Sequence, residues 1–202
     1  MFKSINTIFN NALLRKIFLK SRAIIIFVLL AIVAVYCKPQ WLLTGFAISL
    51  AGELWQVWCF SSLVKNVELT IRGPYVFVRN PMYLARYLLI LGFIVLTGNV
   101  YAVLIYTAFY IFYMYNRVLR EEKRLVKMLG KPYEDYCDQT MRFLPLPTRL
   151  FKKEVWFFDW QVMLSNNGHW NFLLYVIASA ILATYFYFWT SMFSQPFPWR
   201  PF

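Results

Sequence analysis

Five long apolar stretches constrain this chain more than any other feature of its sequence. They cover residues 23–37, 41–64, 83–97, 100–115 and 170–192. Each approaches the roughly 20 apolar residues that cross a bilayer as a helix. Only 15% of the residues are charged, whereas about a quarter are charged in an ordinary soluble domain. The pattern predicts an all-α, polytopic membrane protein with about five transmembrane helices.

The distribution of Lys and Arg predicts how these helices are oriented. The 21 basic residues are concentrated before the first stretch, between the second and third, and between the fourth and fifth. By the positive-inside rule, the N-terminus and the polar segments 65–82 and 117–153 face the cytoplasm. The net charge of +12 therefore suits cytoplasmic loops near anionic lipid. Because the basic residues are scattered among the spans, nucleic acid is not an expected partner.

The apolar stretches divide the chain into five segments. We expect an amphipathic interfacial helix over residues 1–22, two transmembrane helices over 23–64, a core over 65–145 with a helical hairpin at 83–116, an interfacial aromatic segment over 146–169, and a fifth transmembrane helix with a tail over 170–202. A basic amphipathic helix before a span lies on the membrane surface. The hairpin is expected to be tight because only Gly98 and Asn99 separate its two helices.

The sequence offers no metal site of ordinary spacing. Its three cysteines, Cys37, Cys59 and Cys137, are far apart, and His169 is its single histidine. Zinc sites need about four such ligands in close groups. We therefore expect no metal, and we expect the first two cysteines to be small core residues.

One polar motif, GPYVFVRNPMY, occupies residues 73–83. Gly73 begins a turn that lets the backbone approach a ligand, and Arg79 offers a planar fork for a carboxylate. Asn80 can cap the helix that Pro81 opens, and a helix N-terminus attracts anionic groups. Aromatic rings such as that of Tyr75 can stack on a flat base or a cation. The alternative is that the motif is only a capped helix entry with interfacial aromatics.

A second polar motif, RVLREEKRLVKMLGKPYEDY, occupies residues 117–136. We expect a helix that ends at Gly130, followed by a short helix at 133–139. Glu121 and Glu122 project about 100° apart on the first helix, so one of them can face inward and hold amino or hydroxyl groups of a ligand. The alternative is a solvated charged helix that follows a span.

Glu53 is the acidic residue that lies inside a predicted span. A carboxylate at membrane depth is costly and marks a functional or a paired position. Gly52 beside it lets a neighbouring helix approach closely. Two interpretations stay open: Glu53 binds a substrate, or it bonds a neighbouring helix and fixes the packing.

Together, the two motifs resemble those of the isoprenylcysteine carboxyl methyltransferases and the related phospholipid methyltransferases. Those proteins share the pattern G-x-Y-x-x-x-R-H-P-x-Y, a helical hairpin, and then R-x-x-x-E-E-x-x-L-x-x-x-x-G-x-x-Y-x-x-Y with a later basic residue before a proline. The similarity covers about residues 52–145. The matching positions are Gly73, Tyr75, Arg79, Pro81, Tyr83, Arg117, Glu121, Glu122, Leu125, Gly130, Tyr133, Tyr136, Arg142 and Pro145.

The resemblance implies an integral membrane enzyme that uses S-adenosylmethionine to methylate a lipophilic or lipid-anchored acceptor at the cytoplasmic face of a lipid bilayer. Arg117 and Glu122 would be catalytic, and Arg117 would also lie toward the acceptor. Glu53 and Arg86 are further candidates for binding the acceptor. The alternative for Arg86 is that its side chain extends to the lipid head groups. The implied cofactor-binding residues are Glu68, Leu69, Thr70, Gly73, Tyr75, Arg79, Asn80, Pro81, Met82, Tyr83, Glu121, Glu122, Tyr133 and Tyr136.

The chain departs from the family pattern at three places. Asn80 stands where the family often has His, Val67 stands where prenylcysteine enzymes have another His, and Ala85 and Arg86 follow Tyr83 where a glycine is common. Two other functions stay open: a membrane reductase of the sterol or steroid type that binds NADPH, and a non-catalytic binding protein on the same fold. The acceptor also stays open among a prenylcysteine carboxylate, a phospholipid amine and a small hydrophobic acid, as does the oligomeric state.

Overall fold

The structure is a computed structural model that describes residues 24, 27–64 and 68–192. The interfacial helix expected over residues 1–22, Val67 and the tail from residue 193 lie outside the described residues. The described part is helical and contains no strand. Its helices are Phe27–Tyr36, η1 (Pro39–Trp41), α3 (Leu42–Ser62), η2 (Gly73–Val76), α4 (Pro81–Val95), α5 (Val100–Leu129), α6 (Lys131–Gln139), η3 (Pro147–Arg149), η4 (Lys153–Trp156), α7 (Trp160–Ser165) and α8 (Gly168–Met192).

Three helices of the described part are long and apolar enough to cross a membrane: Pro39–Ser62, Val100–Leu129 and Gly168–Phe188. Two shorter apolar helices, Phe27–Tyr36 and Pro81–Val95, overlap the first and third predicted spans. The prediction of an all-α protein with membrane-spanning helices is therefore confirmed in this coarse form. The total of five spans stays a prediction.

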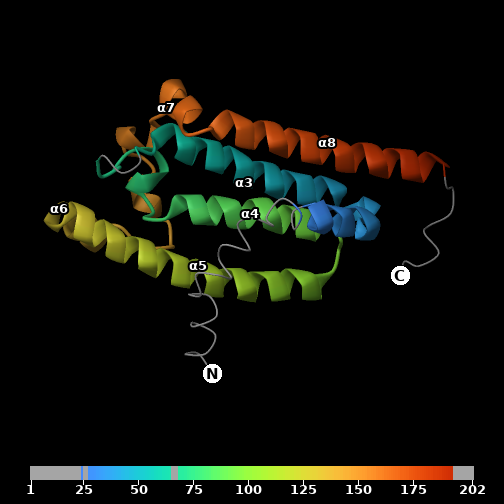
Figure 1. Cartoon of the computed structure of the whole chain (residues 1–202), viewed down its shortest axis with the longest axis horizontal. Coiled ribbons are helices and arrows are strands. Elements are labelled where there is room, and N and C mark those ends of the chain that lie inside the picture. The colour runs from blue at the N-terminus through green and yellow to red at the C-terminus, as the bar shows by residue number, and fades with distance from the viewer. Residues whose placement is uncertain (1–23, 25–26, 65–67, 193–202) are drawn as a thin grey trace.

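Four long helices lie side by side in the order α8, α3, α4, α5 (Figure 1). The contact between α3 and α4 is close because glycines lie in it. A Cβ atom at Gly52 would lie 2.3 Å from the backbone nitrogen of Leu89, and one at Gly92 would lie 2.3 Å from that of Ser49. Small residues let helix backbones approach in this way. The hydroxyl groups of Ser49 and Tyr175, 3.1 Å apart, then join α3 to α8.

Helices α4 and α5 form the expected tight hairpin. Gly98 adopts a φ of 58° in the turn, which glycine reaches without steric cost. The side chain of Asn99 then caps α5 by accepting two backbone hydrogen bonds. Further along the pair, the Tyr110 hydroxyl donates to the Tyr83 carbonyl oxygen at 2.8 Å. This contact fixes how α5 is rotated against α4.

Helix α5 is longer than the predicted span. The span expected at 100–115 and the charged helix expected from residue 117 are one continuous helix of 30 residues, which is about 45 Å long. It ends before Gly130, as predicted, and the φ of Gly130 is 61°. The hydrocarbon core of a bilayer is about 30 Å thick, so a helix of this length extends several turns beyond it.

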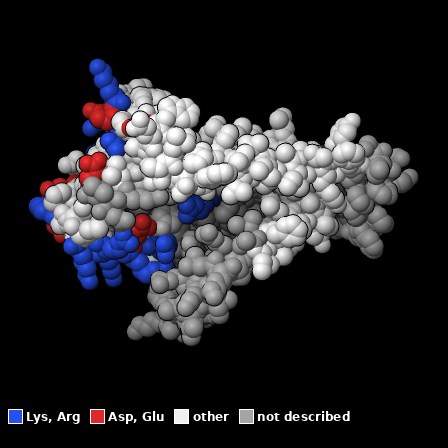
Figure 2. Space-filling view, turned by 45° about the horizontal axis from the view of Figure 1, so that its top comes forward, with Lys and Arg blue, Asp and Glu red and all other residues white. Residues whose placement is uncertain are grey.

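Charged side chains gather at one end of the molecule (Figure 2). We call this the charged end. It contains the end of α3 at Ser62, the start of α4 at Pro81 and the end of α5 at Leu129 (Figure 1). Both polar motifs therefore lie at the same end of the helix layer, as the sequence predicts.

The aromatic segment expected over residues 146–169 packs on the first motif. The Leu146 nitrogen donates to the Phe77 carbonyl oxygen at 2.8 Å, and Val155 is buried against the same loop. Large aromatic side chains of this segment point outward, and Phe151 is 91% and Trp156 74% exposed. Its location in the lipid headgroup layer stays a prediction.

Candidate functional site

The charged end contains a cavity of about 390 Å³. Small-molecule sites in proteins measure roughly 300–1,000 Å³. Its walls come from the segment after α3, from η2, from the first two turns of α4, from the second half of α5 and from α6. The lining residues are Leu63, Val64, Glu68, Leu69, Thr70, Tyr75, Arg79, Asn80, Met82, Tyr83, Arg86, Arg117, Glu121, Arg124, Leu125, Met128, Leu129, Tyr133 and Tyr136.

The cavity brings together most of the predicted site residues, although they are far apart in the sequence. Four predicted residues, Glu53, Gly73, Pro81 and Glu122, are not among those that line it. The predicted residues that do line it are Glu68, Leu69, Thr70, Tyr75, Arg79, Asn80, Met82, Tyr83, Arg86, Arg117, Glu121, Tyr133 and Tyr136.

Gly73 shapes the turn that presents Tyr75 to the cavity. Its φ is 60°, a conformation that side chains rarely adopt. A Cβ atom at Gly73 would also lie 2.0 Å from the hydroxyl oxygen of Ser62. Backbone conformation and close contact both require glycine here, so Gly73 contributes to the site through the shape of the chain.

Asn80 precedes α4, but its side chain does not cap the helix. Pro81 does open the helix, as predicted. The Asn80 amide nitrogen instead donates to the Arg142 carbonyl oxygen at 3.2 Å and to Glu122 Oε1 at 3.4 Å. The capping prediction is wrong, because the side chain is oriented by these two hydrogen bonds of its amide nitrogen. A buried carboxylate is a strong acceptor for such a donor.

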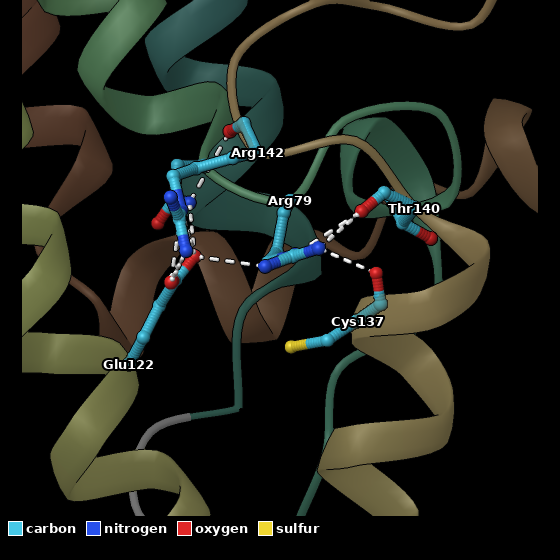
Figure 3. Close-up of polar contacts among 6 residues, drawn as sticks. Arg79, Glu122, Cys137, Thr140 and Arg142 are labelled. Carbon is cyan, nitrogen blue, oxygen red and sulfur yellow. Dashed lines mark hydrogen bonds and ion pairs between the residues drawn. The ribbon is translucent and has the colours of Figure 1, made fainter.

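Arg79, Glu122 and Arg142 form an ion cluster beside the cavity (Figure 3). Glu122 Oε1 lies 3.1 Å from Arg79 Nη1, and Glu122 Oε2 lies 2.7 Å from Arg142 Nη2. Arg79 also donates to the backbone carbonyl oxygens of Cys137 and Thr140. The hydrogen bond to Glu122 raises the pKa of Arg142. The cluster therefore ties the first motif to α5 and to the segment after α6.

Tyr83 connects two charged side chains of α5 at the cavity wall. Its hydroxyl donates to Glu121 Oε2 at 2.7 Å and accepts a hydrogen bond from the side chain of Arg117. Residues 117 and 121 are one helical turn apart, so both side chains can reach one phenol. Tyr83 thus holds a carboxylate and a guanidinium in fixed positions on the cavity wall.

Three further tyrosines give the cavity neutral hydrogen-bond donors. Burial raises the pKa of Tyr75, of Tyr133 and of Tyr136 above the ordinary value of a phenol. These hydroxyl groups therefore stay protonated even above neutral pH. The Tyr136 hydroxyl donates to the Tyr75 carbonyl oxygen at 2.7 Å. This bond joins α6 to η2 and closes one side of the site.

Arg86 and Glu53 lie further from the charged end. Arg86 is in the second turn of α4 and lines the cavity. Glu53 is buried in α3, next to Gly52, where a Cβ atom would lie 2.8 Å from the Ala85 carbonyl oxygen. The two candidates for acceptor binding therefore flank the same helix contact. Because Glu53 does not line the cavity, its direct contact with an acceptor stays a prediction.

Six lining residues were not among the predicted site residues: Leu63, Val64, Arg124, Leu125, Met128 and Leu129. The last four follow Glu121 on α5 at intervals of three, four, seven and eight residues. This spacing marks one face of a helix, so an inward-facing Glu121 would have identified them. Leu63 and Val64 carry no such signal. They directly follow α3, and they line the cavity only because of the path that the chain takes there.

Comparison with known proteins identifies the family. A model of the family described as phospholipid methyltransferase matches residues 29–132, about half of the chain. The match includes α3, α4 and α5 and most of the cavity lining. The chain belongs to the phospholipid methyltransferase family. The resemblance carried by the two motifs is confirmed.

Two curated proteins share part of this phospholipid methyltransferase-like chain. The nickel-cobalt-cadmium resistance protein NccN of Alcaligenes xylosoxydans xylosoxydans is 31% identical over 111 residues, which are 54% of this chain and 50% of that protein. The protein-S-isoprenylcysteine O-methyltransferase of Schizosaccharomyces pombe is 29% identical over 110 residues, which are 54% of this chain and 46% of that enzyme. The chain thus spans about half the length of these relatives. No solved structure matches it.

Proposed function

We propose that this protein is an S-adenosylmethionine-dependent methyltransferase that acts on a lipophilic or lipid-anchored acceptor at the cytoplasmic face of a membrane. The observation that carries the proposal is the convergence of both family motifs on one cavity. A chain that used the motifs only to enter and leave the membrane would not need them to enclose a common space. Family membership then supplies the class of reaction.

The lining residues fit the chemistry of S-adenosylmethionine. The carboxylates of Glu68 and Glu121 suit its hydroxyl and amino groups, and the arginine side chains of the lining suit its carboxylate. The tyrosine rings suit its flat adenine and its positive sulfur. When bound, the cofactor supplies a methyl group on a positively charged sulfur. The residues proposed to hold it are the predicted cofactor-binding residues that line the cavity: Glu68, Leu69, Thr70, Tyr75, Arg79, Asn80, Met82, Tyr83, Glu121, Tyr133 and Tyr136.

Arg117 is the residue proposed to orient the acceptor. Its hydrogen bond to Tyr83 fixes the guanidinium before an acceptor binds, which reduces the entropy lost on binding. Apolar side chains such as Leu125 and Met128 line the same cavity and help to exclude water from it.

Glu122 acts through its neighbours in this proposal. It lies in the ion cluster rather than on the cavity wall, and it holds the cavity residues Arg79 and Asn80 by hydrogen bonds. We therefore assign it a positioning role, and its predicted contact with the cofactor stays a prediction.

The membrane topology is part of the proposal. All five apolar helices cross the bilayer, and the N-terminus and the charged end lie on the cytoplasmic side, as the positive-inside rule demands. Helix α4 has 15 residues and is about 22 Å long. Flanking residues and local bilayer thinning accommodate a helix of this length. The lipid bilayer is then the source of the acceptor.

The names of similar proteins support a lipophilic acceptor. The family description names phospholipids, and the name of the S. pombe enzyme gives isoprenylcysteine as its acceptor. Both are lipid-soluble molecules with a polar head group. An acceptor of this kind can keep its chain in the bilayer while its head group reaches a cavity that begins at the membrane surface.

Methyl transfer is tested with the full chain in lipid nanodiscs. The protein is incubated with S-adenosylmethionine that carries a tritiated methyl group and with a pool of phospholipids, apolar acids and prenylated peptides. We expect label in the organic phase above that of empty discs, and about tenfold less label with Glu121→Gln, which removes a cavity carboxylate. Cofactor binding without label in any acceptor would contradict the proposal.

A further inference from the structure

Arg86 is the lining residue that lies furthest along α4 from Pro81. It is the sixth residue of α4, so its Cα lies about 7.5 Å along the helix axis from Pro81, in the direction of the apolar half. It lines the cavity together with Met82 and Tyr83. A charged side chain this far into an apolar helix is costly, and its position indicates a partner or a ligand.

The donors of Arg86 are available to a ligand. Within the part of the chain that the structure describes, no hydrogen bond or ion pair involves its guanidinium. Two other cavity arginines differ in this respect: Arg79 is paired with Glu122, and Arg117 is bonded to Tyr83. The described protein groups therefore leave the donors of Arg86 for something that binds.

Glu53 interacts electrostatically with Arg86 across the contact between α3 and α4. Its buried carboxylate attracts the Arg86 guanidinium, yet no ion pair joins the two residues. Its Oε1 atom has no hydrogen-bond partner among the described residues. The carboxyl group of Glu53 thus lies within electrostatic range of Arg86 without occupying its donors.

The charge of the cavity favours an anionic ligand group. Its lining holds four arginines and two glutamates, and Glu121 already accepts a hydrogen bond from Tyr83. A bound sulfonium adds one more positive charge. At short range inside a protein, such charges attract an anion and repel an ammonium group strongly.

We propose that Arg86 selects an acceptor with an anionic head group and that Glu53 is its positioning residue. This inference rests on the proposed function and names the charge class of its acceptor. A carboxylate or phosphate matches the planar fork of Arg86 with two parallel hydrogen bonds. An anionic oxygen or sulfur also has no proton to lose before it accepts a methyl group, whereas a phospholipid amine does. The acceptor is therefore an amphiphilic anion whose chain lies in the bilayer.

The test compares dodecyl probes that differ only in their head group. Dodecanoate, dodecyl phosphate, dodecylamine and dodecanol are titrated into the full chain in zwitterionic nanodiscs, with empty discs as the blank, and binding is measured by calorimetry. We expect at least one anionic probe to bind about tenfold more tightly than the amine and the alcohol, as a charge-assisted bond to Arg86 predicts. Which anion binds best distinguishes a carboxylate acceptor from a phosphate acceptor.

Three variants connect the preference to Arg86. Arg86→Gln should weaken anion binding about tenfold, and Arg86→Lys, which keeps the charge but not the fork, should weaken it less. Lys127→Gln removes the same charge from the end of α5, outside the cavity, and should leave binding unchanged. The inference would be overturned if the amine bound more tightly than the anionic probes. It would also be overturned if Arg86→Gln bound the anions as tightly as the unchanged protein does.

The titrations are run with and without S-adenosylmethionine, so that the two proposals can fail separately. Loss of anion binding in Arg86→Gln with intact S-adenosylmethionine binding supports both proposals. Anion selectivity that depends on Arg86 in a protein that binds no S-adenosylmethionine would keep the anion site and refute the methyltransferase. Cofactor binding without anion selectivity would refute the anion site alone.

Discussion

Nη1 of Arg79 lies 3.1 Å from Oε1 of Glu122, and this ion pair joins the loop before α4 to the middle of the charged half of α5. Both side chains are about nine-tenths buried. Arg142 approaches the other carboxylate oxygen from the segment after α6. One carboxylate therefore binds two guanidinium groups from two separate segments, and the wall of the cavity depends on it.

Glu122→Gln should destabilise the protein, because it leaves two guanidinium groups without their counter-charge. Removing one partner of a buried ion pair costs about 3–5 kcal/mol, and the lower figure is expected here because Arg142 is 36% exposed. The free energy of unfolding is measured in detergent by denaturant titration. Glu121→Gln is the matched control, since it removes the same charge one residue away at an exposed position. Equal stability of the two variants would contradict a structural role for Glu122.

Tyr83→Phe should weaken S-adenosylmethionine binding about tenfold, because Arg117 and Glu121 lose the hydroxyl that holds both. The hydrogen bond from the Tyr110 hydroxyl to the backbone carbonyl of residue 83 is kept in this variant, so its melting temperature should change little. Tyr87→Phe removes a hydroxyl from the same helix that bonds Thr107 outside the cavity. If both variants bind the cofactor equally well, Tyr83 does not organise the site.

Gly73→Ala should destabilise the protein more than Gly130→Ala does. Both glycines have a φ near 60°, so both variants pay a backbone cost of about 1–2 kcal/mol. Only at Gly73 does the new Cβ meet another atom, the Ser62 hydroxyl oxygen at 2.0 Å, whereas nothing lies within 4 Å at Gly130. Melting temperatures measured in one detergent compare the two variants. A smaller loss for Gly73→Ala would show that the turn before Tyr75 can relax.

A double-mutant cycle of Glu53→Gln and Arg86→Gln should reveal coupling between α3 and α4. Side chains that attract each other typically show interaction energies of about 0.5–3 kcal/mol. The single variants should each shift the free energy of unfolding, and the double variant should lose less than the two losses combined. Additive effects would mean that Glu53 does not position Arg86.

Much of the helix order could be predicted from the sequence because its signals are local. Apolar runs of sufficient length predict helices, and Gly98 and Gly130 end elements where the backbone adopts a positive φ. The sequence does not predict the continuity of α5, because the change from apolar to charged residues near Arg117 resembles a helix boundary. A helix ends where its backbone hydrogen bonding ends, not where its side chains change polarity.

The candidate site was predicted less completely than the fold. Motif spacing identified Tyr83 and Glu121, which the structure brings into contact. It could not decide that Glu121 faces the cavity and Glu122 the ion cluster. That choice depends on how α5 is rotated against α4, and tertiary contacts such as the bond from Tyr110 to the Tyr83 carbonyl set the rotation. The turn of Asn80 toward Glu122 likewise follows from a residue distant in the sequence.

Titration of the detergent-purified protein with S-adenosylmethionine, and separately with NADPH, tests the central claim most directly. We predict saturable binding of S-adenosylmethionine with a dissociation constant of roughly micromolar order, weakened about tenfold in Glu121→Gln, and no binding of NADPH. Binding of NADPH alone would instead indicate a membrane reductase. Binding of neither compound by folded protein would contradict the methyltransferase account and indicate a non-catalytic member of the family.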